Sequence, residues 1–392
     1  MDAFTTPSNW QRVRLGDIGK PCMCKRVMKH QTTRYGEIPF YKIGTFGNTA
    51  DAFISKKLFL EYKTKYSFPK KGDILISASG TIGRAVIYDG KPAYFQDSNI
   101  VWIDNDETLV KNDFLFYAYS NIKWNTEHTT ILRLYNDNFR NTLIPLPPLN
   151  EQIAIANVLS DVDRYLCSLR ALILKKESIK KALSFELLSQ RKRLKGFNQA
   201  WQKVRLGDIC EFGNGGAYET LIVENGNFKL ISLNSIDIDG NLKNTMKRVN
   251  FYDNSLKQDD IVMVLSDVAH GDFLGLCAVI PSNDYVLNQR MGRLRKRNDC
   301  INILFLRLYI NANQKYFKMQ GQGSSQLNLS KKAIEDFEIL LPPLNEQIAI
   351  ANILSGLDSE ITSLKNKKRQ FENIKKALNH DLMSAKIRVL KE

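Results

Sequence analysis

The sequence lacks the features that mark a membrane protein or a secreted protein. Among its 392 residues, no continuous apolar run comes near the roughly 18–20 residues that a transmembrane helix needs. The N-terminal stretch MDAFTTPSNWQRVRLGD has no basic segment followed by an apolar core, which a secretion signal requires. We therefore expect a protein of the cytoplasm that makes no membrane contact.

Cysteine is also sparse. The six cysteines are scattered along a long chain, a distribution that favours reduced thiols over a disulfide framework. Two of them form a Cys-x-Cys motif, but no second Cys/His pair lies at zinc-site spacing, so we expect no metal site. The six are Cys22, Cys24, Cys167, Cys210, Cys277 and Cys300.

Motifs for catalysis are missing as well. The segment 79–83, Ser-Gly-Thr-Ile-Gly, is too short for a phosphate-binding loop and lacks its Gly-Lys-Ser/Thr ending. No Asn-Pro-Pro-Phe/Tyr methyltransferase signature and no Asp…Glu-x-Lys nuclease cluster stands out. The four histidines occupy positions that do not correspond between the two repeats described below. We expect no catalytic residue in this chain.

What the sequence does have is an excess of basic residues. Its formal net charge of +15 and pI near 9.4 favour a polyanionic partner. Residues 20–145 contain 18 Lys and Arg against 12 Asp and Glu, whereas residues 210–340 contain 15 of each. The second segment must therefore gather its basic residues on one side. Its one dense basic run comprises Arg290, Arg293, Arg295, Lys296 and Arg297.

An internal repeat organises the chain. Residues 10–18, WQRVRLGDI, return as WQKVRLGDI at 201–209, with eight of nine positions identical. Residues 146–163, LPPLNEQIAIANVLSDVD, return at 341–358 with fifteen of eighteen positions identical. Segments 20–145 and 211–340, which lie between the repeated motifs, share little plain identity. A constant frame around two variable inserts predicts one shared partner surface and two different targets.

The pattern predicts an α/β (α+β) fold in which two globular domains of mixed α/β structure are separated by two long helices. Residues 1–145 and 201–340 are expected to be globular domains, and residues 146–200 and 341–392 to be helical spacers. Short strands are expected at 73–77 and 260–266, followed by second strands at 83–88 and 274–280. Helices are expected at 113–121 and 301–311. Asp17 and Asp208 each follow Leu-Gly, which indicates a turn or a helix cap.

Two long helices are expected after the Pro-Pro motifs, with Asn150 and Asn345 as N-caps. Apolar residues then recur at coiled-coil spacing, so each helix is expected to pack antiparallel against the other as a rigid spacer of roughly 60 Å. Four lysines interrupt these apolar stripes: Lys176, Lys180, Lys368 and Lys375. They are either solvated positions that set the register of the helix pair or contacts to a DNA backbone. The stripes comprise Leu159, Val162, Leu166, Leu169, Ile173, Leu183 and Leu187, and then Leu354, Leu357, Ile361, Leu364, Phe371, Leu378 and Leu382.

These repeated motifs resemble the specificity subunits of Type I restriction–modification enzymes. The resemblance rests on Trp-x-x-Val-Arg-Leu-Gly-Asp-Ile opening each half and Leu-Pro-Pro-Leu-Asn-Glu-Gln-Ile-Ala-Ile-Ala preceding each long helix. It implies two target recognition domains, each reading one half of a bipartite site in double-stranded DNA, with helices that set the gap. Two modification (methyltransferase) subunits would supply S-adenosylmethionine chemistry. Restriction subunits would supply chemistry that uses ATP and Mg, so this chain itself would bind no cofactor.

The twofold repetition around the Pro-Pro motifs implies two equivalent docking surfaces for two identical modification subunits. The residues expected to dock them are Pro147, Pro148, Asn150, Glu151, Gln152, Pro342, Pro343, Asn345, Glu346 and Gln347.

Loops with arginine, amide and hydroxyl side chains are the expected DNA contacts, because arginine pairs with guanine and Asn or Gln with adenine. In the first domain they comprise Lys42, Thr45, Asn48, Ser79, Thr81, Arg84, Gln96, His128, Thr130 and Arg133. In the second they comprise Asn234, Ser235, Asp267, His270, Asn288, Gln289, Arg290, Gln322, Ser324, Ser325, Gln326 and Asn328. Two alternatives remain open: a scaffold whose domains bind proteins, and a solitary DNA-binding regulator.

Overall fold

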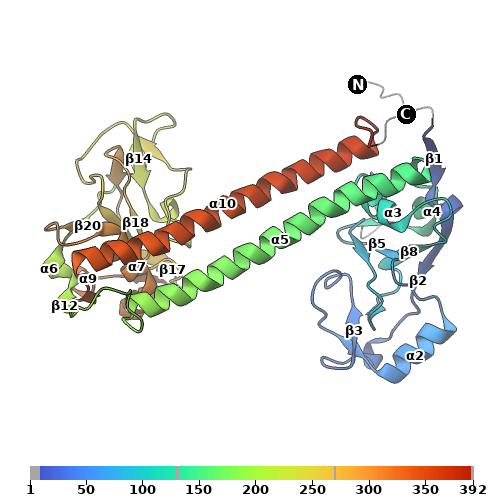
Figure 1. The fold of residues 1–392 in the computed structure, drawn as a ribbon, viewed down its shortest axis with the longest axis horizontal. Coiled ribbons are helices and arrows are strands. Elements are labelled where there is room, and N and C mark those ends of the chain that lie inside the picture. The colour runs from blue at the N-terminus through green and yellow to red at the C-terminus, as the bar shows by residue number, and fades with distance from the viewer. Residues whose placement is uncertain (1–8, 129–131, 269–270, 390–392) are drawn as a thin grey trace. The chain divides into compact units, whose positions relative to one another are not determined.

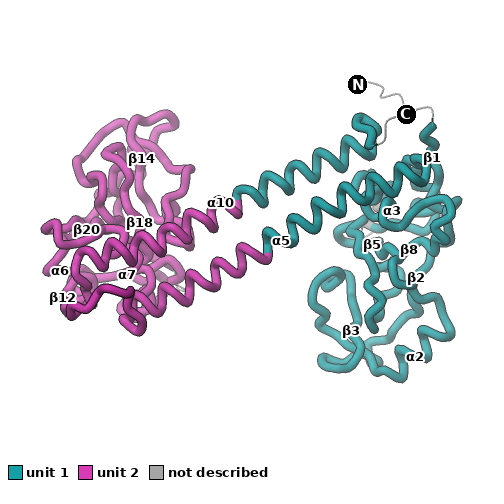
Figure 2. The backbone as a smooth tube through the Cα atoms, viewed as in Figure 1, with its two compact units in different colours: residues 1–170, 366–392 teal, residues 171–365 magenta. Residues whose placement is uncertain are grey.

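The computed structural model describes residues 9–128, 132–268 and 271–389. It divides into two compact units, residues 1–170 with 366–392 and residues 171–365 (Figure 2). Each unit combines one globular domain with part of both long helices. This division differs from the four segments expected from the sequence, because the end of each long helix packs on the domain of the other half of the chain.

The first domain contains two main sheets. A four-stranded antiparallel sheet has the order β2-β8-β5-β6, and a three-stranded sheet has the order β4-β3-β7 with β3 parallel to β7 (Figure 1). The pairs β1–β11 and β9–β10 complete it. The strands are β1 Gln11–Arg14, β2 Gly19–Met23, β3 Ile38–Tyr41, β4 Phe53–Ile54, β5 Ile74–Ser77, β6 Ala85–Ile87, β7 Tyr94–Phe95, β8 Ile100–Asn105, β9 Glu127–His128, β10 Leu132–Arg133 and β11 Leu143–Leu146. The helices are α1 Leu15–Ile18, α2 Lys56–Lys65, α3 Asn112–Tyr119 and α4 Asn136–Asn141.

The second domain repeats this topology. Its four-stranded sheet has the order β13-β20-β16-β18 and its three-stranded sheet the order β15-β14-β19, with β12–β22 and β17–β21 as further pairs. The strands are β12 Gln202–Arg205, β13 Cys210–Asn214, β14 Phe228–Ile231, β15 Arg248–Val249, β16 Ile261–Val264, β17 Ser266–Val268, β18 Cys277–Val279, β19 Tyr285–Leu287, β20 Met291–Lys296, β21 Gln326–Asn328 and β22 Glu338–Leu341. The helices are α6 Leu206–Ile209, α7 Ile303–Ala312, α8 Gln314–Gln320 and α9 Lys331–Glu335.

One inner strand of each four-stranded sheet, β5 or β16, is buried along its whole length because it separates two cores. In β5, Ile74 and Ile76 face a core that includes the long helices, while Leu75 faces a core toward the three-stranded sheet. In β16, Ile261 and Met263 face the helix side, and the intervening valines face the other core. Successive side chains of a strand point to opposite faces. The expected strands and short helices are thus confirmed, with ends shifted by a few residues.

The turn role expected for Asp17 and Asp208 is also confirmed. Asp17 Oδ2 accepts a hydrogen bond of 3.2 Å from the backbone N–H of Arg14, at the start of α1. Asp208 Oδ2 accepts an equivalent 3.2 Å bond from Arg205 N–H at the start of α6. Both carboxylates satisfy a backbone donor at a helix N-terminus, which stabilises the entry into the helix.

The two long helices are α5 Leu149–Leu188 and α10 Leu344–Met383, each of 40 residues. Both begin two residues earlier than N-caps at Asn150 and Asn345 would place them, so these asparagines lie inside the first turn and are not N-caps. Pro148 and Pro343 precede the helices, and the carbonyl of each accepts hydrogen bonds from the N–H groups of Glu and Gln in that turn. None of the described helices is long and apolar enough to cross a membrane.

The helices run antiparallel in each unit. In the first unit, the rings of Tyr165 and Phe371 lie 4.7 Å apart, and Lys375 Nζ lies 2.6 Å from Asp163 Oδ1. In the second unit, Lys176 Nζ lies 2.9 Å from Glu360 Oε1, and Lys180 pairs with Asp358. The fourth interrupting lysine, Lys368, pairs along its own helix with Glu372 at 2.8 Å. All four lysines are therefore held by carboxylates of the helix pair, which favours the register-setting interpretation.

Candidate nucleic-acid interface

A buried Trp–Glu–Arg cluster fixes the start of each long helix. In the first unit, Glu151 accepts a 3.1 Å hydrogen bond from Trp10 Nε1 and an ion pair from Arg388, with 2.6 Å between Nε and Oε1. Glu151 is 3% exposed, so its charge is compensated inside the protein.

The second unit contains the same cluster. Glu346 accepts from Trp201 Nε1 at 3.0 Å and from Arg193 Nη2 at 2.7 Å. It is 0% exposed. The repeated Trp of the opening motif and the repeated Glu of the Pro-Pro motif are thus joined in each half, and an arginine from outside both motifs completes the site.

The neighbouring glutamines hold the start of α3 in the first domain and of α7 in the second domain in place. Gln152 accepts from the backbone N–H of Lys111 at 2.9 Å and donates to the carbonyls of Leu109 and Pro147. Gln347 accepts from Asn302 N–H at 2.8 Å and donates to Cys300 and Pro342. These amides make their hydrogen bonds to backbone groups of their own unit.

This arrangement corrects the expectation for the docking residues. Glu151, Gln152, Glu346 and Gln347 are buried and fully engaged inside their own units, and Pro147 and Pro342 are buried too, so none of them offers an exposed surface. Pro148 and Pro343 are half-buried, whereas Asn150 and Asn345 are exposed. The strict repetition of these residues fits an internal joint, because removing one partner of a buried ion pair leaves an uncompensated charge.

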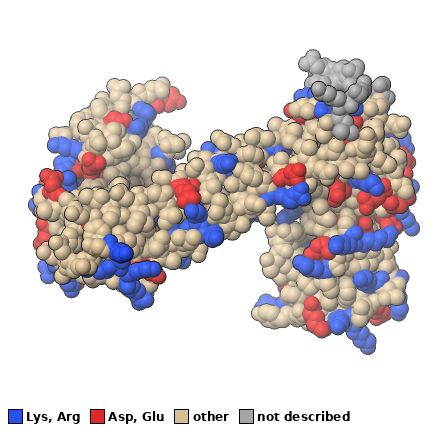
Figure 3. All heavy atoms as spheres, in the orientation of Figure 1, with Lys and Arg blue, Asp and Glu red and all other residues tan. Residues whose placement is uncertain are grey.

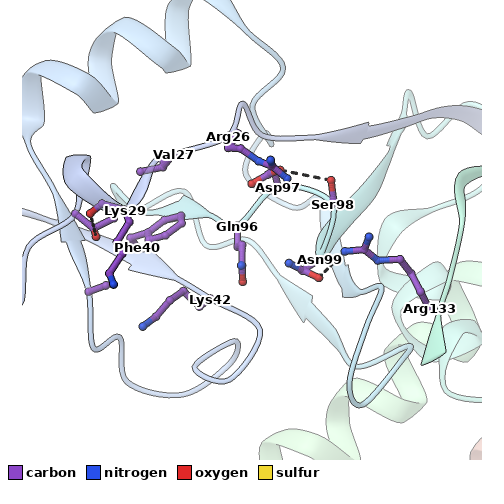
Figure 4. A pocket seen from close by; sticks show the side chains of 12 residues that line it. Arg26, Val27, Lys29, Phe40, Lys42, Gln96, Asp97, Ser98, Asn99 and Arg133 are labelled. Carbon is purple, nitrogen blue, oxygen red and sulfur yellow. Dashed lines mark hydrogen bonds and ion pairs between the residues drawn. The ribbon is translucent and has the colours of Figure 1, made fainter. Parts of the chain in front are cut away.

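Loops expected to contact DNA converge in the first domain around a hollow of about 440 Å³ (Figure 4). Lys42, Gln96 and Arg133, from three different expected regions, line it together. The sequence did not single out Arg26, Lys29 and Asn99, which line it as well. Figure 4 shows Asn99 beside Arg133 on one side of the hollow and Lys29 with Lys42 on the other.

The hollow is electropositive. Among the described residues that line it, four are lysines or arginines, and the one acidic side chain, Asp97, is paired with Arg26 at 3.0 Å. Lys42 Nζ also lies 2.8 Å from Asp51, and the hydrogen bond from Lys42 lowers the pKa of that carboxyl group. Basic and amide side chains around one concave surface fit a phosphate backbone and the edges of bases.

Several other expected residues of the first domain are joined to these loops by hydrogen bonds. Arg84 reaches the loop of Asn48, with 3.5 Å from Nη2 to Oδ1, and Gln96 Oε1 accepts from Ile43 N–H at 3.0 Å. Thr45 Oγ1 accepts from the backbone of Lys42 at 3.1 Å. Thr81 is exposed, whereas Ser79 is 7% exposed and donates to Asn99 Oδ1 at 2.7 Å. Ser79 is therefore placed to hold Asn99.

In the second domain, two expected loops form one small sheet. Strand β17 pairs with β21, so that Ser266 lies opposite Asn328 and Asp267 opposite Leu327. Asp267 Oδ2 accepts from Phe273 N–H at 2.7 Å, which closes its loop. Gln322 exchanges backbone hydrogen bonds with Asn328. Gln322, Ser324 and Ser325 are exposed, and Gln326 is half-buried.

Two expected contacts of the second domain are wrong because the side chains are internal. Ser235 is 2% exposed, and its hydroxyl group bonds to Leu230 and Ser232. Asn288 is 4% exposed, accepts from Tyr218 N–H and donates to Glu219 at 2.9 Å. Asn234 remains exposed.

Gln289 lies on the surface, next in the chain to the buried Asn288. Its Nε2 donates to Glu219 Oε1 at 3.0 Å, and this bond lowers the pKa of Glu219. Gln289 therefore remains a candidate contact.

Most of the basic run in the second domain is structural. Arg293 pairs with Glu211 at 2.6 Å, Arg295 pairs with the buried Asp260 at 2.6 Å, and Lys296 pairs with Asp299 at 2.8 Å. Arg297 donates to the carbonyl of Gly207. Within the described residues, the exposed guanidinium of Arg290 makes no hydrogen bond or ion pair, which leaves it available for a ligand.

Surface charge alone does not outline an interface. On the face drawn in Figure 3, lysine and arginine side chains are interspersed with acidic ones over the coloured atoms. Thr130 and His270 lie outside the described residues. His128 lies in β9 opposite Leu132, and only its backbone is described. The candidate interface is therefore defined by the converging loops.

Comparison with known proteins identifies the fold and the family. The sequence matches the Type I restriction modification DNA specificity domain twice, over residues 7–181 and 198–373. It is 28% identical over 420 residues to the Type I restriction enzyme MjaVIII specificity subunit of Methanocaldococcus jannaschii, a match that covers 99% of this chain and 95% of that protein. It is also 63% identical over 148 residues, 38% of each chain, to a putative Type I specificity subunit of Haemophilus influenzae.

A solved structure has the same fold. The Type I restriction–modification S subunit from M. genitalium shares 19% sequence identity, with a TM-score of 0.65 over 96% of this chain and 97% of that one. The duplicated domains, the two long helices and the double match of the domain family agree. The chain therefore belongs to the family of Type I restriction–modification DNA specificity subunits.

Proposed function

We propose that this chain is the non-catalytic, sequence-reading subunit of a Type I restriction–modification complex, with each domain reading one half of a bipartite site in double-stranded DNA. The observation that carries the proposal is the contrast between the two halves. Their topology and their buried Trp–Glu–Arg joints are the same, whereas the loops at the candidate interface carry different side chains. A duplicated frame that presents two different polar surfaces fits two different half-sites.

The first domain would hold its half-site through the basic hollow and the amide side chains around it. The second domain, with no excess charge, would rely on Arg290 and on the exposed amides of its loops. The ion pairs between α5 and α10 fix the register of the helices, so the spacing between half-sites would be a property of the helix pair.

Partner docking is proposed on the exposed side of each first helical turn. Leu149 and Ile153 of α5 are 40% and 46% exposed, and their repeats in α10, Leu344 and Ile348, are 37% and 38% exposed. An apolar pair that is exposed twice, with identical residues, fits two copies of one partner. We propose that two modification subunits dock there and supply methylation from S-adenosylmethionine. Restriction subunits would supply the ATP- and Mg-dependent cleavage.

Methylation mapping tests the proposal. DNA from cells that co-express this chain with its modification subunit would be compared with DNA from cells that express the modification subunit alone. We expect a methylated motif of two short specified blocks around a fixed unspecified gap, present only with this chain. An assembled and active complex without such a motif would contradict DNA reading and favour a protein-binding scaffold.

A further inference from the structure

We propose that Asn99 with Arg133 in the first domain, and Arg290 with Asn328 in the second, are equivalent base-reading pairs in which asparagine and arginine have exchanged places. The inference rests on the proposed function and names the residues that set part of the specificity. It follows from backbone hydrogen bonds that make the positions of the two sites equivalent, although the asparagine and the arginine themselves do not align.

The first position of each pair lies directly before a strand of the four-stranded sheet. Asn99 precedes β8, and its carbonyl accepts from Ala78 N–H at 2.8 Å. Arg290 precedes β20, and its carbonyl accepts from Leu265 N–H at 3.0 Å. Strands β8 and β20 occupy the same place in their sheets. Asn99 and Arg290 therefore occupy equivalent backbone positions.

The second position of each pair lies opposite a serine. Arg133 forms a β-bridge with Ser79, as Asn328 does with Ser266. The next residue donates its N–H back to the position before that serine, from Leu134 to Ala78 and from Leu329 to Leu265, at 2.8 Å in both cases. Arg133 and Asn328 are equivalent by this register.

The serine holds the asparagine in both domains, although the asparagine comes from different segments. Ser79 Oγ donates to Asn99 Oδ1, and Ser266 Oγ donates to Asn328 Oδ1. In the first domain Arg133 Nη2 also donates to Asn99 Oδ1, at 3.0 Å. Because a guanidinium has five N–H donors, this single bond leaves Arg133 with donors for a ligand. Asn328 Nδ2 also donates to the carbonyl of Gln326 at 3.3 Å, which leaves one N–H and one lone pair of this amide for a ligand. Each domain therefore places one serine-held asparagine and one arginine at these two backbone positions.

These two residue types favour different bases. Arginine bonds to O6 and N7 of guanine, and asparagine bonds to N6 and N7 of adenine, in the major groove. Each half-site is therefore expected to contain one guanine and one adenine read by this pair. Because the residues have exchanged places, the positions of these two bases, relative to the domain that reads them, are exchanged between the half-sites.

The test converts one arrangement into the other in the intact complex. Asn99→Arg combined with Arg133→Asn gives the first domain the arrangement of the second. Mapping of the methylated motif is expected to show changed bases in one block, with the gap and the other block unchanged. The reciprocal double variant, Arg290→Asn with Asn328→Arg, is expected to change only the other block. Lys57→Gln, a change of an exposed lysine on α2 that does not line the hollow, is the control and should leave both blocks unchanged.

A second measurement tests the inference even if the double variants fail to fold. Arg290→Gln changes an exposed side chain, and its complex would be titrated with DNA carrying each single base change in the wild-type motif. We expect discrimination to fall about tenfold or more at one base pair only. Uniform weakening at all positions would assign Arg290 to a phosphate and overturn the inference. The inference would also be overturned if the wild type had a bipartite motif and the double variants methylated the same two blocks. A wild type without a bipartite motif would instead contradict the proposed function itself.

Discussion

Arg388 forms a two-pronged ion pair with Glu151, 237 positions earlier in the chain, with 2.6 Å from Nε to Oε1 and 2.9 Å from Nη2 to Oε2. The same geometry joins Arg193 to Glu346 in the second half. The segment after α10 thus returns to the motif that starts the first long helix, just as the segment between the halves returns to the motif that starts the second.

Removing one member of this pair should destabilise the protein. Arg388→Ala leaves the buried carboxylate of Glu151 with Trp10 as its remaining side-chain partner, and the expected cost is about 3–5 kcal/mol of unfolding free energy. Arg193→Ala should have a similar effect through Glu346. Urea unfolding measures both, and Lys332→Ala, at a lysine outside the joint, is the control. A cost below about 1 kcal/mol would show that the pair behaves as a solvated surface ion pair.

The stability lost on substitution should differ between positions along the helix pair. The contacting rings of Tyr165 and Phe371, tilted by 55°, occupy the repeat-equivalent positions of the Glu360–Lys176 ion pair, at a displacement of 195 residues. We expect Phe371→Ala to cost about 1–2 kcal/mol. Lys176→Ala should cost less than about 1 kcal/mol, because both partners are partly exposed. Thermal unfolding of both variants, at low and high salt, checks this order, and an equal cost would contradict it.

The exposed apolar pairs at the helix starts should control partner number. Ile153→Asp should reduce the bound modification subunits from two to one, and so should Ile348→Asp. The double variant should bind none. Leu174→Asp is the matched control, because Leu174 is 60% exposed on α5 but away from the first turn. Mass measurement of the assembled complex gives the stoichiometry, and two bound subunits in the double variant would place docking elsewhere.

Thiol labelling should separate the cysteines by burial. Burial raises the pKa of Cys24 and of Cys210 to about 12, and it also raises the pKa of Cys277, so at pH 8 these thiols remain protonated. Cys167 and Cys300 are exposed. Iodoacetamide is therefore expected to label Cys167 and Cys300 first, and the buried three only after unfolding. Fast labelling of Cys277 in the folded protein would contradict its placement in the core.

The sequence repeat predicted most of the helices and strands, because the residue patterns that mark them are local or strictly periodic. Leu159, Leu354 and Leu382 of the predicted stripes are buried, and the apolar runs at 74–76 and 261–264 became central strands. The N-cap prediction at Asn150 was wrong because the preceding Pro148 carbonyl already accepts the first backbone donors of the helix.

The role of the repeated Glu-Gln motif could not be decided from sequence. Strict repetition fits an internal joint and a partner surface equally well, and only burial separates them. Asn99 was missed for another reason. Its significance comes from Ser79 and Arg133, which are 20 and 34 residues away in the chain. The exchange of asparagine and arginine is invisible to alignment, since the two segments share little identity.

Exchange of one variable segment tests the two-domain account most directly. Residues 20–145 would be replaced by the corresponding segment of a family member with a different methylated motif, and the motif of the chimeric complex would be mapped. We expect one block to become that of the donor, while the second block and the gap length stay as in the wild type. A change in both blocks, or in the gap, would contradict independent reading by the two domains.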